Sequence, residues 1–169
     1  MLLAFHDDHP SFAAAHWRNG VIVVWTGKVT AEALDRLHMF QAARPRSYER
    51  YYIVTVNPTG LPFPDSQARS VARELIRKRD HEPLDVITVL EGDGLFASAG
   101  RVVLSALFSR ANAKDVICQD MTEAARALTS RVLPAADERA ARMALEVVRG
   151  EARKRRRVDT SGVASHPPS

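Results

Sequence analysis

The sequence contains one cysteine and no long hydrophobic run. Cys118 has no second thiol in the chain to pair with, which excludes an intramolecular disulfide and favours a reducing compartment. No apolar stretch approaches the roughly 18 residues that a transmembrane helix requires. The first residues also lack the basic start and the apolar core of a signal peptide. We therefore expect a soluble, cytoplasmic protein with no transmembrane segment.

Net charge is absent from most of the chain and concentrated at its end. The whole chain carries +4, and the segment 149–169, with six basic and two acidic residues, carries the same net charge. Residues 1–148 are therefore neutral. With 46% hydrophobic and 26% charged residues, the composition is that of a folded globular domain and excludes disorder of the whole chain.

The hydrophobic pattern alternates between the periods of strands and of helices. Two apolar segments flank Asn19-Gly20, a dipeptide typical of a hairpin turn. Beyond it, β-branched runs predict buried strands, and apolar residues spaced by three and four predict amphipathic helices. The predicted strands are 11–18, 21–25, 51–56, 84–90 and 115–119, and the predicted helices are 30–43, 65–79, 95–110, 122–133 and 137–148.

This order of elements predicts an α/β fold. Strands that alternate with helices form crossovers onto a mainly parallel sheet, here of four to five strands, with an antiparallel N-terminal hairpin at its edge and helices packed against it. We expect an α/β domain at 1–134 and a C-terminal helix at 135–150. In that helix, Ala140, Met143, Ala144 and Val147 are predicted to face the domain. Residues 151–169 are polar and rich in Pro and Ser, so a disordered basic tail is expected there.

The order of elements resembles that of the STAS family, the domain type of anti-sigma-factor antagonists, over about residues 11–133. That family places an Asp-Ser pair after its third strand, at the start of the next helix, and Asp65-Ser66 occupies this point. The resemblance implies a non-enzymatic, STAS-like regulatory module that binds another protein. In antagonists of the family, a second Ser or Thr and then Gly-Leu follow, and the second hydroxyl accepts phosphate from a partner kinase. Here Gln67, Ala68 and Arg69 follow instead, so a member of this kind would be divergent.

Ser66 remains a candidate phosphosite on physical grounds. A phosphate at a helix N-terminus interacts favourably with the free backbone N–H groups and with the helix dipole, by roughly 0.3–1 kcal/mol. The alternative is that Asp65 and Ser66 only cap the helix, as such pairs commonly do.

The candidate partner-binding surface lies at the carboxyl ends of the predicted parallel strands, where open α/β sheets tend to bind ligands and partners. Local packing of the loops is the alternative for these residues. The surface consists of Leu61, Phe63, Asp65, Ser66, Asp93, Leu95 and Phe96.

Two further motifs offer alternative functions. The turn Gly92–Ala97 fits G-x-G-x-x-A between a strand and a helix, so a small nucleotide-binding protein or enzyme is one alternative, although Glu91 and Asp93 place negative charge where a pyrophosphate would lie. The segment 6–9 (HDDH) contains metal-ligand types, but consecutive residues of an extended chain point to opposite sides and converge poorly on one ion. We therefore expect no metal, no cofactor and no catalytic residue.

The end of the chain carries a polybasic segment. Its length suits phosphate-rich surfaces, which bind such segments by counterion release. Binding of nucleic acid or of another anionic surface is thus a second alternative function, and a solvated tail without function is the other interpretation. The residues concerned are Arg153, Lys154, Arg155, Arg156 and Arg157.

Overall fold

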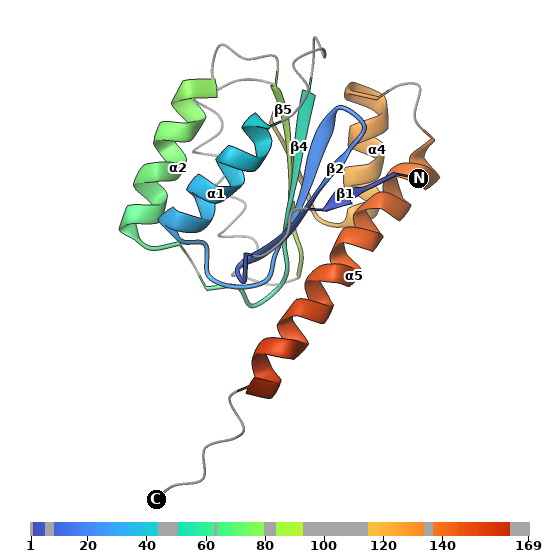
Figure 1. Ribbon diagram of the computed structural model, residues 1–169. Coiled ribbons are helices and arrows are strands. Elements are labelled where there is room, and N and C mark those ends of the chain that lie inside the picture. The colour runs from blue at the N-terminus through green and yellow to red at the C-terminus, as the bar shows by residue number, and fades with distance from the viewer. Residues whose placement is uncertain are drawn as a thin grey trace, which may run out of the picture.

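In the computed structural model, the chain forms a six-stranded sheet between two layers of helices (Figure 1). The structure describes residues 2–5, 9–43, 51–62, 64–79, 84–92, 115–133 and 137–162. The strands are β1 (Ala4–Phe5), β2 (Phe12–Trp17), β3 (Gly20–Trp25), β4 (Tyr51–Asn57), β5 (Leu84–Leu90) and β6 (Val116–Cys118). The helices are α1 (Ala31–Ala42), α2 (Ser66–Arg79), α4 (Met121–Arg131) and α5 (Glu138–Gly162).

The strands lie in the sheet in the order in which they occur along the chain. Strands β3 to β6 are parallel, whereas β1 and β2 are antiparallel to their neighbours. The predicted α/β class and the mainly parallel sheet with an antiparallel hairpin are therefore confirmed. The short strand β1 was not predicted, and it, not the hairpin, forms that edge of the sheet. The predicted helix 95–110 lies outside the described residues.

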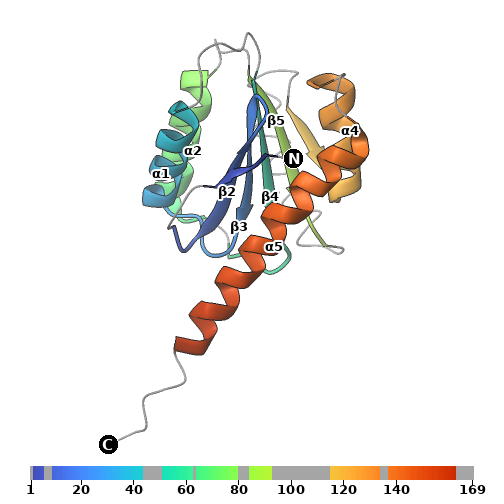
Figure 2. The same ribbon diagram turned by 45° about the vertical axis from the view of Figure 1, so that its right-hand side comes forward.

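The layer formed by α1 and α2 follows from the direction of the crossovers. Right-handed connections from β3 to β4 and from β4 to β5 place α1 and α2 on the same face, because the chain moves across the sheet in one direction. Figure 2 shows these helices on one side of the sheet and α4 and α5 on the other. Both faces of the central strands are consequently buried, which explains why β3 and β4 are apolar without interruption over most of their length.

The main core lies between the sheet and the layer of α4 and α5. Alternate strand residues such as Ile22, Val54 and Val89 point to this side and are fully buried. The face of α5 that covers them has helical spacing and consists of Ala141, Ala144, Leu145, Val148 and Ala152. Of the residues predicted to face the domain, Ala144 is fully buried and Ala140 packs against the core, whereas Met143 and Val147 are exposed by 46% and 44%.

The C-terminal helix is also longer than predicted. We expected it to end at 150 and to be followed by a disordered tail, but α5 continues to Gly162. Two arginines of the predicted tail donate hydrogen bonds to backbone carbonyls: Arg155 Nη1 to Phe12 in β2 at 3.4 Å, and Arg156 Nε to Thr26, just after β3, at 2.7 Å. The helix therefore gains tertiary partners that offset the entropy cost of ordering a polar segment.

The hairpin turn lies one residue earlier than predicted. Trp17 pairs with Gly20, so the two loop residues are Arg18 and Asn19. Of these, Arg18 has a positive φ of 54°, a conformation that costs a non-glycine residue roughly 1–2 kcal/mol. Gly20 is therefore the first residue of β3.

The ring of Tyr52 leaves room only for a glycine at position 20. The two residues are partners on neighbouring strands, and a Cβ at Gly20 would lie 2.5 Å from atoms of the ring. Tyr52 extends across Gly20 and donates a hydrogen bond from its hydroxyl to the carbonyl of Trp17 at 2.6 Å. Burial also raises the pKa of this phenol far above its usual value. The hydroxyl therefore stays protonated and keeps its role as a donor.

We predict that Gly20→Ala lowers the free energy of unfolding by about 1–3 kcal/mol, because the ring of Tyr52 must move. The matched control is Gly150→Ala in α5, where an added Cβ meets nothing within 4 Å. That change is expected to raise stability by about 0.5–1 kcal/mol through helix propensity. Urea denaturation followed by circular dichroism measures both, and equal effects of the two changes would contradict this role of Gly20.

Candidate functional site

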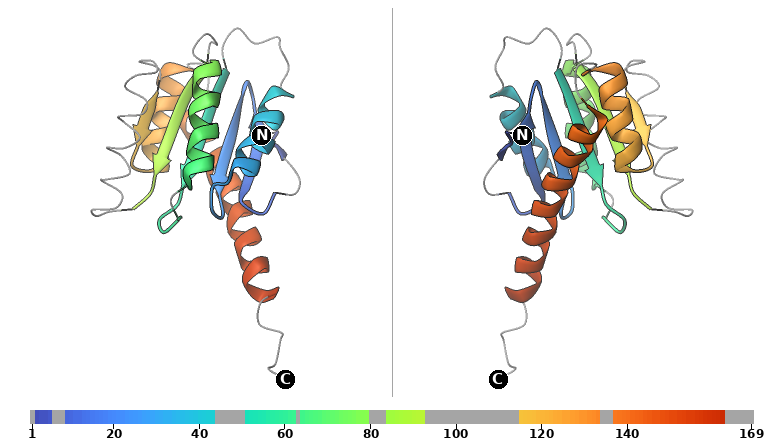
Figure 3. Two further views of the ribbon diagram at one scale, coloured as in Figure 1. Left: turned by 90° about the vertical axis from the view of Figure 1, so that its left-hand side faces the viewer. Right: turned by 90° about the vertical axis from the view of Figure 1, so that its right-hand side faces the viewer.

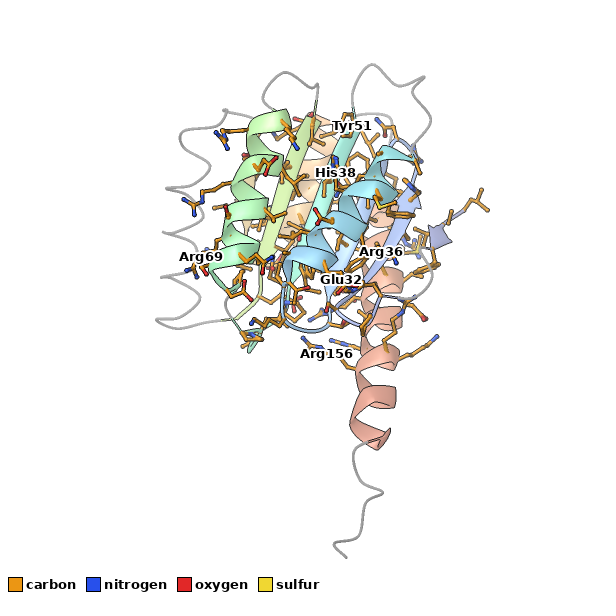
Figure 4. The ribbon with its side chains drawn as sticks, turned by 60° about the vertical axis from the view of Figure 1, so that its left-hand side comes forward. Glu32, Arg36, His38, Tyr51, Arg69 and Arg156 are labelled. Atoms are coloured by element: carbon orange, nitrogen blue, oxygen red, sulfur yellow. The ribbon has the colours of Figure 1, made fainter. Side chains whose placement is uncertain are left out.

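The carboxyl ends of β3, β4 and β5 lie together at one end of the sheet, which we call its carboxyl edge, and α1 and α2 begin there. Both helices begin with a capping side chain: Thr30 accepts a hydrogen bond from the N–H of Ala33 at 3.1 Å, and Asp65 accepts one from Ala68 at 2.9 Å. The capping role expected for Asp65 is therefore confirmed. Figure 4 shows Glu32 and Arg69 toward this end of the two helices, and Tyr51 toward the opposite end.

Asp65 holds the start of α2 in place with both of its carboxylate oxygens. While Oδ1 caps the helix, Oδ2 lies 3.0 Å from Lys28 Nζ in the loop after β3. The hydrogen bond from Ala68 and then the contact with Lys28 lower the pKa of Asp65, so its carboxylate is ionised at neutral pH. Arg69 Nη1 donates to the carbonyl of Pro64 at 2.7 Å. The chain is thus fixed on both sides of Ser66.

The first turn of α2 is exposed except for one residue. Ser66, Gln67 and Arg69 are exposed, whereas Ala68 is fully buried. We call the surface formed by Lys28, Asp65, Ser66, Gln67 and Arg69 the α2 entry.

The structure brings only part of the predicted partner-binding surface together. Asp65 and Ser66 lie at the α2 entry. Leu61 is half-buried and packs against the cluster that contains Phe12 and Trp25, so much of its side chain serves local packing. The other four predicted residues, Phe63, Asp93, Leu95 and Phe96, lie outside the described residues.

The loops after β4 and β5 are joined by hydrogen bonds. The backbone N–H of Glu91 donates to the carbonyl of Asn57 at 3.0 Å, and Thr59 Oγ1 donates to the carbonyl of Glu91 at 3.1 Å. Gly92 has a φ of 109°, and a Cβ there would lie 2.6 Å from Thr59 Oγ1. Gly92 is therefore needed for the course of this turn. The remainder of the predicted nucleotide motif, 93–97, lies outside the described residues.

An ion pair connects the carboxyl edge of the sheet to α5. Arg149 Nη2 lies 2.7 Å from Glu91 Oε2, and the two side chains are exposed by only 24% and 14%. Partial burial strengthens such a pair relative to one in open solvent, because water screens it less. The negative charge that the sequence places before the glycine-rich turn is therefore balanced by an arginine of α5.

We predict that Glu91 and Arg149 are coupled by about 1–2 kcal/mol. The test is a double-mutant cycle with Glu91→Gln and Arg149→Met, in which the free energy of unfolding is measured for both single variants and the double variant. The pair Glu74–Lys78 on α2, at 2.8 Å with side chains more than half exposed, is the control. A coupling at Glu91–Arg149 no larger than at this control would show that the pair does not hold α5.

The candidate metal ligands of the described residues do not gather into a metal site. Within the described ranges, no three side chains of His, Cys, Asp or Glu lie together as a metal ion would require. His6, Asp7 and Asp8 of the candidate metal segment lie outside those ranges, and the ring of His9 stacks on Phe12 with centroids 4.8 Å apart. Within the same ranges, no helix is long and apolar enough to cross a membrane.

Cys118 is buried at the end of β6. Burial, together with the nearby carboxylates of Glu123 and Asp120, raises the pKa of its thiol to about 12. Because the thiolate is the reactive form, we predict that iodoacetamide at pH 8 modifies Cys118 at least about a hundredfold more slowly in the folded protein than in urea. Mass spectrometry of timed samples measures the rates, and comparable rates in both states would contradict the burial of this thiol.

The residues that hold the α2 entry and α5 in place were not predicted from the sequence. Lys28, Glu91 and Arg149 each pair with a residue more than 35 positions away, and charge patterns within one helix or loop carry no signal for such contacts. The only sequence feature that pointed to these residues was their position near the end of a predicted strand or a predicted helix.

Comparison of the chain with family models, with curated proteins and with solved structures found no match.

Proposed function

We propose that this protein is a non-enzymatic regulatory module of the STAS-like type that binds another protein through the α2 entry. The observation that carries the proposal is the exposed Ser66 at the first position of α2, held between the cap and ion pair of Asp65 and the hydrogen bond of Arg69. A surface fixed in this way binds with little loss of conformational entropy. The order of elements and the position of Asp65-Ser66 support the STAS-like type.

The same site supports regulation by phosphorylation of Ser66. Its hydroxyl is exposed and stands at a helix N-terminus, where backbone N–H groups and the helix dipole favour an anion. Lys28 and Arg69 add two cationic side chains nearby in the same surface. A phosphate at this point would reverse the charge of the surface and so change its affinity for a partner.

We predict that a photo-crosslinking amino acid at position 66 captures a specific partner in living cells, whereas the same residue at position 130 does not. Ser130 is the matched control, because it is also an exposed helical serine but lies in the last turn of α4, on the other side of the sheet. Captured proteins are identified by mass spectrometry, and the partner is then purified.

Binding of the purified partner is measured by calorimetry with Ser66→Arg and Ser130→Arg. A hot-spot position predicts at least about a thirtyfold loss of affinity for the first variant and no change for the second. Equal crosslinking from both positions, or equal affinity of both variants, would reject the α2 entry as the binding surface. The effect of a negative charge at position 66, such as a phosphate would add, is tested by the same titration with Ser66→Glu, and an affinity equal to that of the parent would contradict regulation by charge at this position.

A further inference from the structure

The end of α5 extends past the body of the protein. Figure 3 shows the helix crossing the sheet and continuing beyond its edge, and Figure 1 shows the same from another side. Ala152 is the last residue of α5 in the main core, with 3% exposure, whereas the helix ends at Gly162. About ten residues, or about 15 Å of helix, therefore lie beyond the core.

This part of α5 carries the positive charge of the chain. It contains Arg153, Lys154, Arg155, Arg156 and Arg157, which we call the basic helix end. Arg153 and Lys154 are exposed, and the Lys154 side chain is exposed by 78%. Glu151 and Asp159 are the nearest acidic residues in sequence, and Glu151, which lies 3.5 Å from Lys154 and 3.6 Å from Arg155, offsets part of this charge.

The hydrogen bonds of Arg155 and Arg156 to the sheet leave their charge in place. A guanidinium has five N–H donors, and a neutral carbonyl oxygen accepts from it without cancelling its charge. These bonds instead fix the orientation of the helix relative to the sheet. The charge of the basic helix end is thus presented on an anchored helix.

We propose that the basic helix end binds the phosphate backbone of double-stranded nucleic acid without reading its sequence. Arginine and lysine neutralise phosphates and release their counterions, which gives affinity that depends steeply on salt. Residues 1–148 carry no net charge, so the positive electrostatic potential that attracts a polyanion comes from the basic helix end.

The composition of this segment favours nucleic acid over an acidic protein as the partner. Protein interfaces depend on apolar or aromatic anchors at their centre, where charged residues are depleted. Among the α5 residues up to Arg156, whose exposure the structure describes, the large exposed apolar residues are Met143 and Val147, which lie earlier in the helix, and positions 153–156 are all basic. Interfaces with nucleic acid are polar and strongly positive, as this surface is.

The test measures binding of the full chain to a labelled DNA duplex of about 20 base pairs by fluorescence anisotropy over a salt series. With four or five phosphates contacted, the slope of log K against log salt is expected to be about −4. Arg153→Gln with Lys154→Gln should lower affinity at least about tenfold and make the slope shallower by about 2. A matched RNA duplex should bind similarly, because only phosphates are contacted.

The matched control is Arg139→Gln with Arg142→Gln, two exposed arginines at the other end of α5 that give the same loss of charge. This variant should bind like the parent, and both variants should keep the circular dichroism spectrum of the parent. Equal losses in the two variants would mean that only net charge matters and would overturn the proposal. An absence of binding at low salt would also overturn it. Binding of poly-L-glutamate with the same affinity and the same dependence on Arg153 and Lys154 would overturn it as well, and would indicate an acidic protein as the partner. Binding at the α2 entry is measured separately with Ser66→Arg, so either proposal can fail alone.

Discussion

The packing of α5 against the sheet is the interaction on which the rest of the structure depends. Both faces of β3 and β4 are apolar, so the sheet needs cover on each side. On one side, α1 and α2 come from the crossovers themselves. On the other side, β2 presents Ala13 and Ala15, whose small side chains leave room for a helix, and the alanines of α5 fill that space. Close packing there buries the largest core of the molecule.

The same helix connects the core to the polar edge of the sheet. Its buried stripe ends at Ala152, and polar contacts made by Arg149 and Arg156 lie at the level where that stripe ends. The apolar stripe ends and the polar contacts begin within one or two turns of the helix. This change fixes the position of α5 along the sheet and its rotation about its own axis. A helix held only by alanines could slide or rotate at smaller cost, because small side chains interlock less.

The sequence allowed the central fold to be predicted because its local signals agreed with the tertiary structure. Runs such as 51–56 and 84–90 are β-branched and correspond to β4 and β5, and Asp65 caps a helix as expected. The errors concern features that depend on distant partners. Gly20 was assigned to the turn, although its contact with Tyr52 on another strand places it in β3.

The C-terminal segment shows the same limit in energetic terms. Composition alone predicts disorder for a basic, polar stretch, because local interactions do not repay its conformational entropy. The carbonyls of Phe12 and Thr26, at the start of β2 and just after β3, supply partners that no pattern within the segment reveals. For the candidate site, the sequence identified Asp65 and Ser66 through their place at a helix start. It could not identify Lys28, whose role depends on the loop after β3 lying next to α2.

These contacts join the two candidate binding surfaces through a short path in the structure. Arg156 of the basic helix end binds the carbonyl of Thr26, Lys28 lies two residues further along the same loop, and Lys28 pairs with Asp65 at the start of α2. A polyanion that drew the arginine away from Thr26 would remove one contact of this loop, while the N–H groups of Thr26 and Gly27 would still donate to the carbonyl of Ser11. Any effect on the position of Lys28, and on the charge next to Ser66, would be limited by these remaining bonds. Any influence of one surface on the other would therefore pass through this loop, because it contacts both of them.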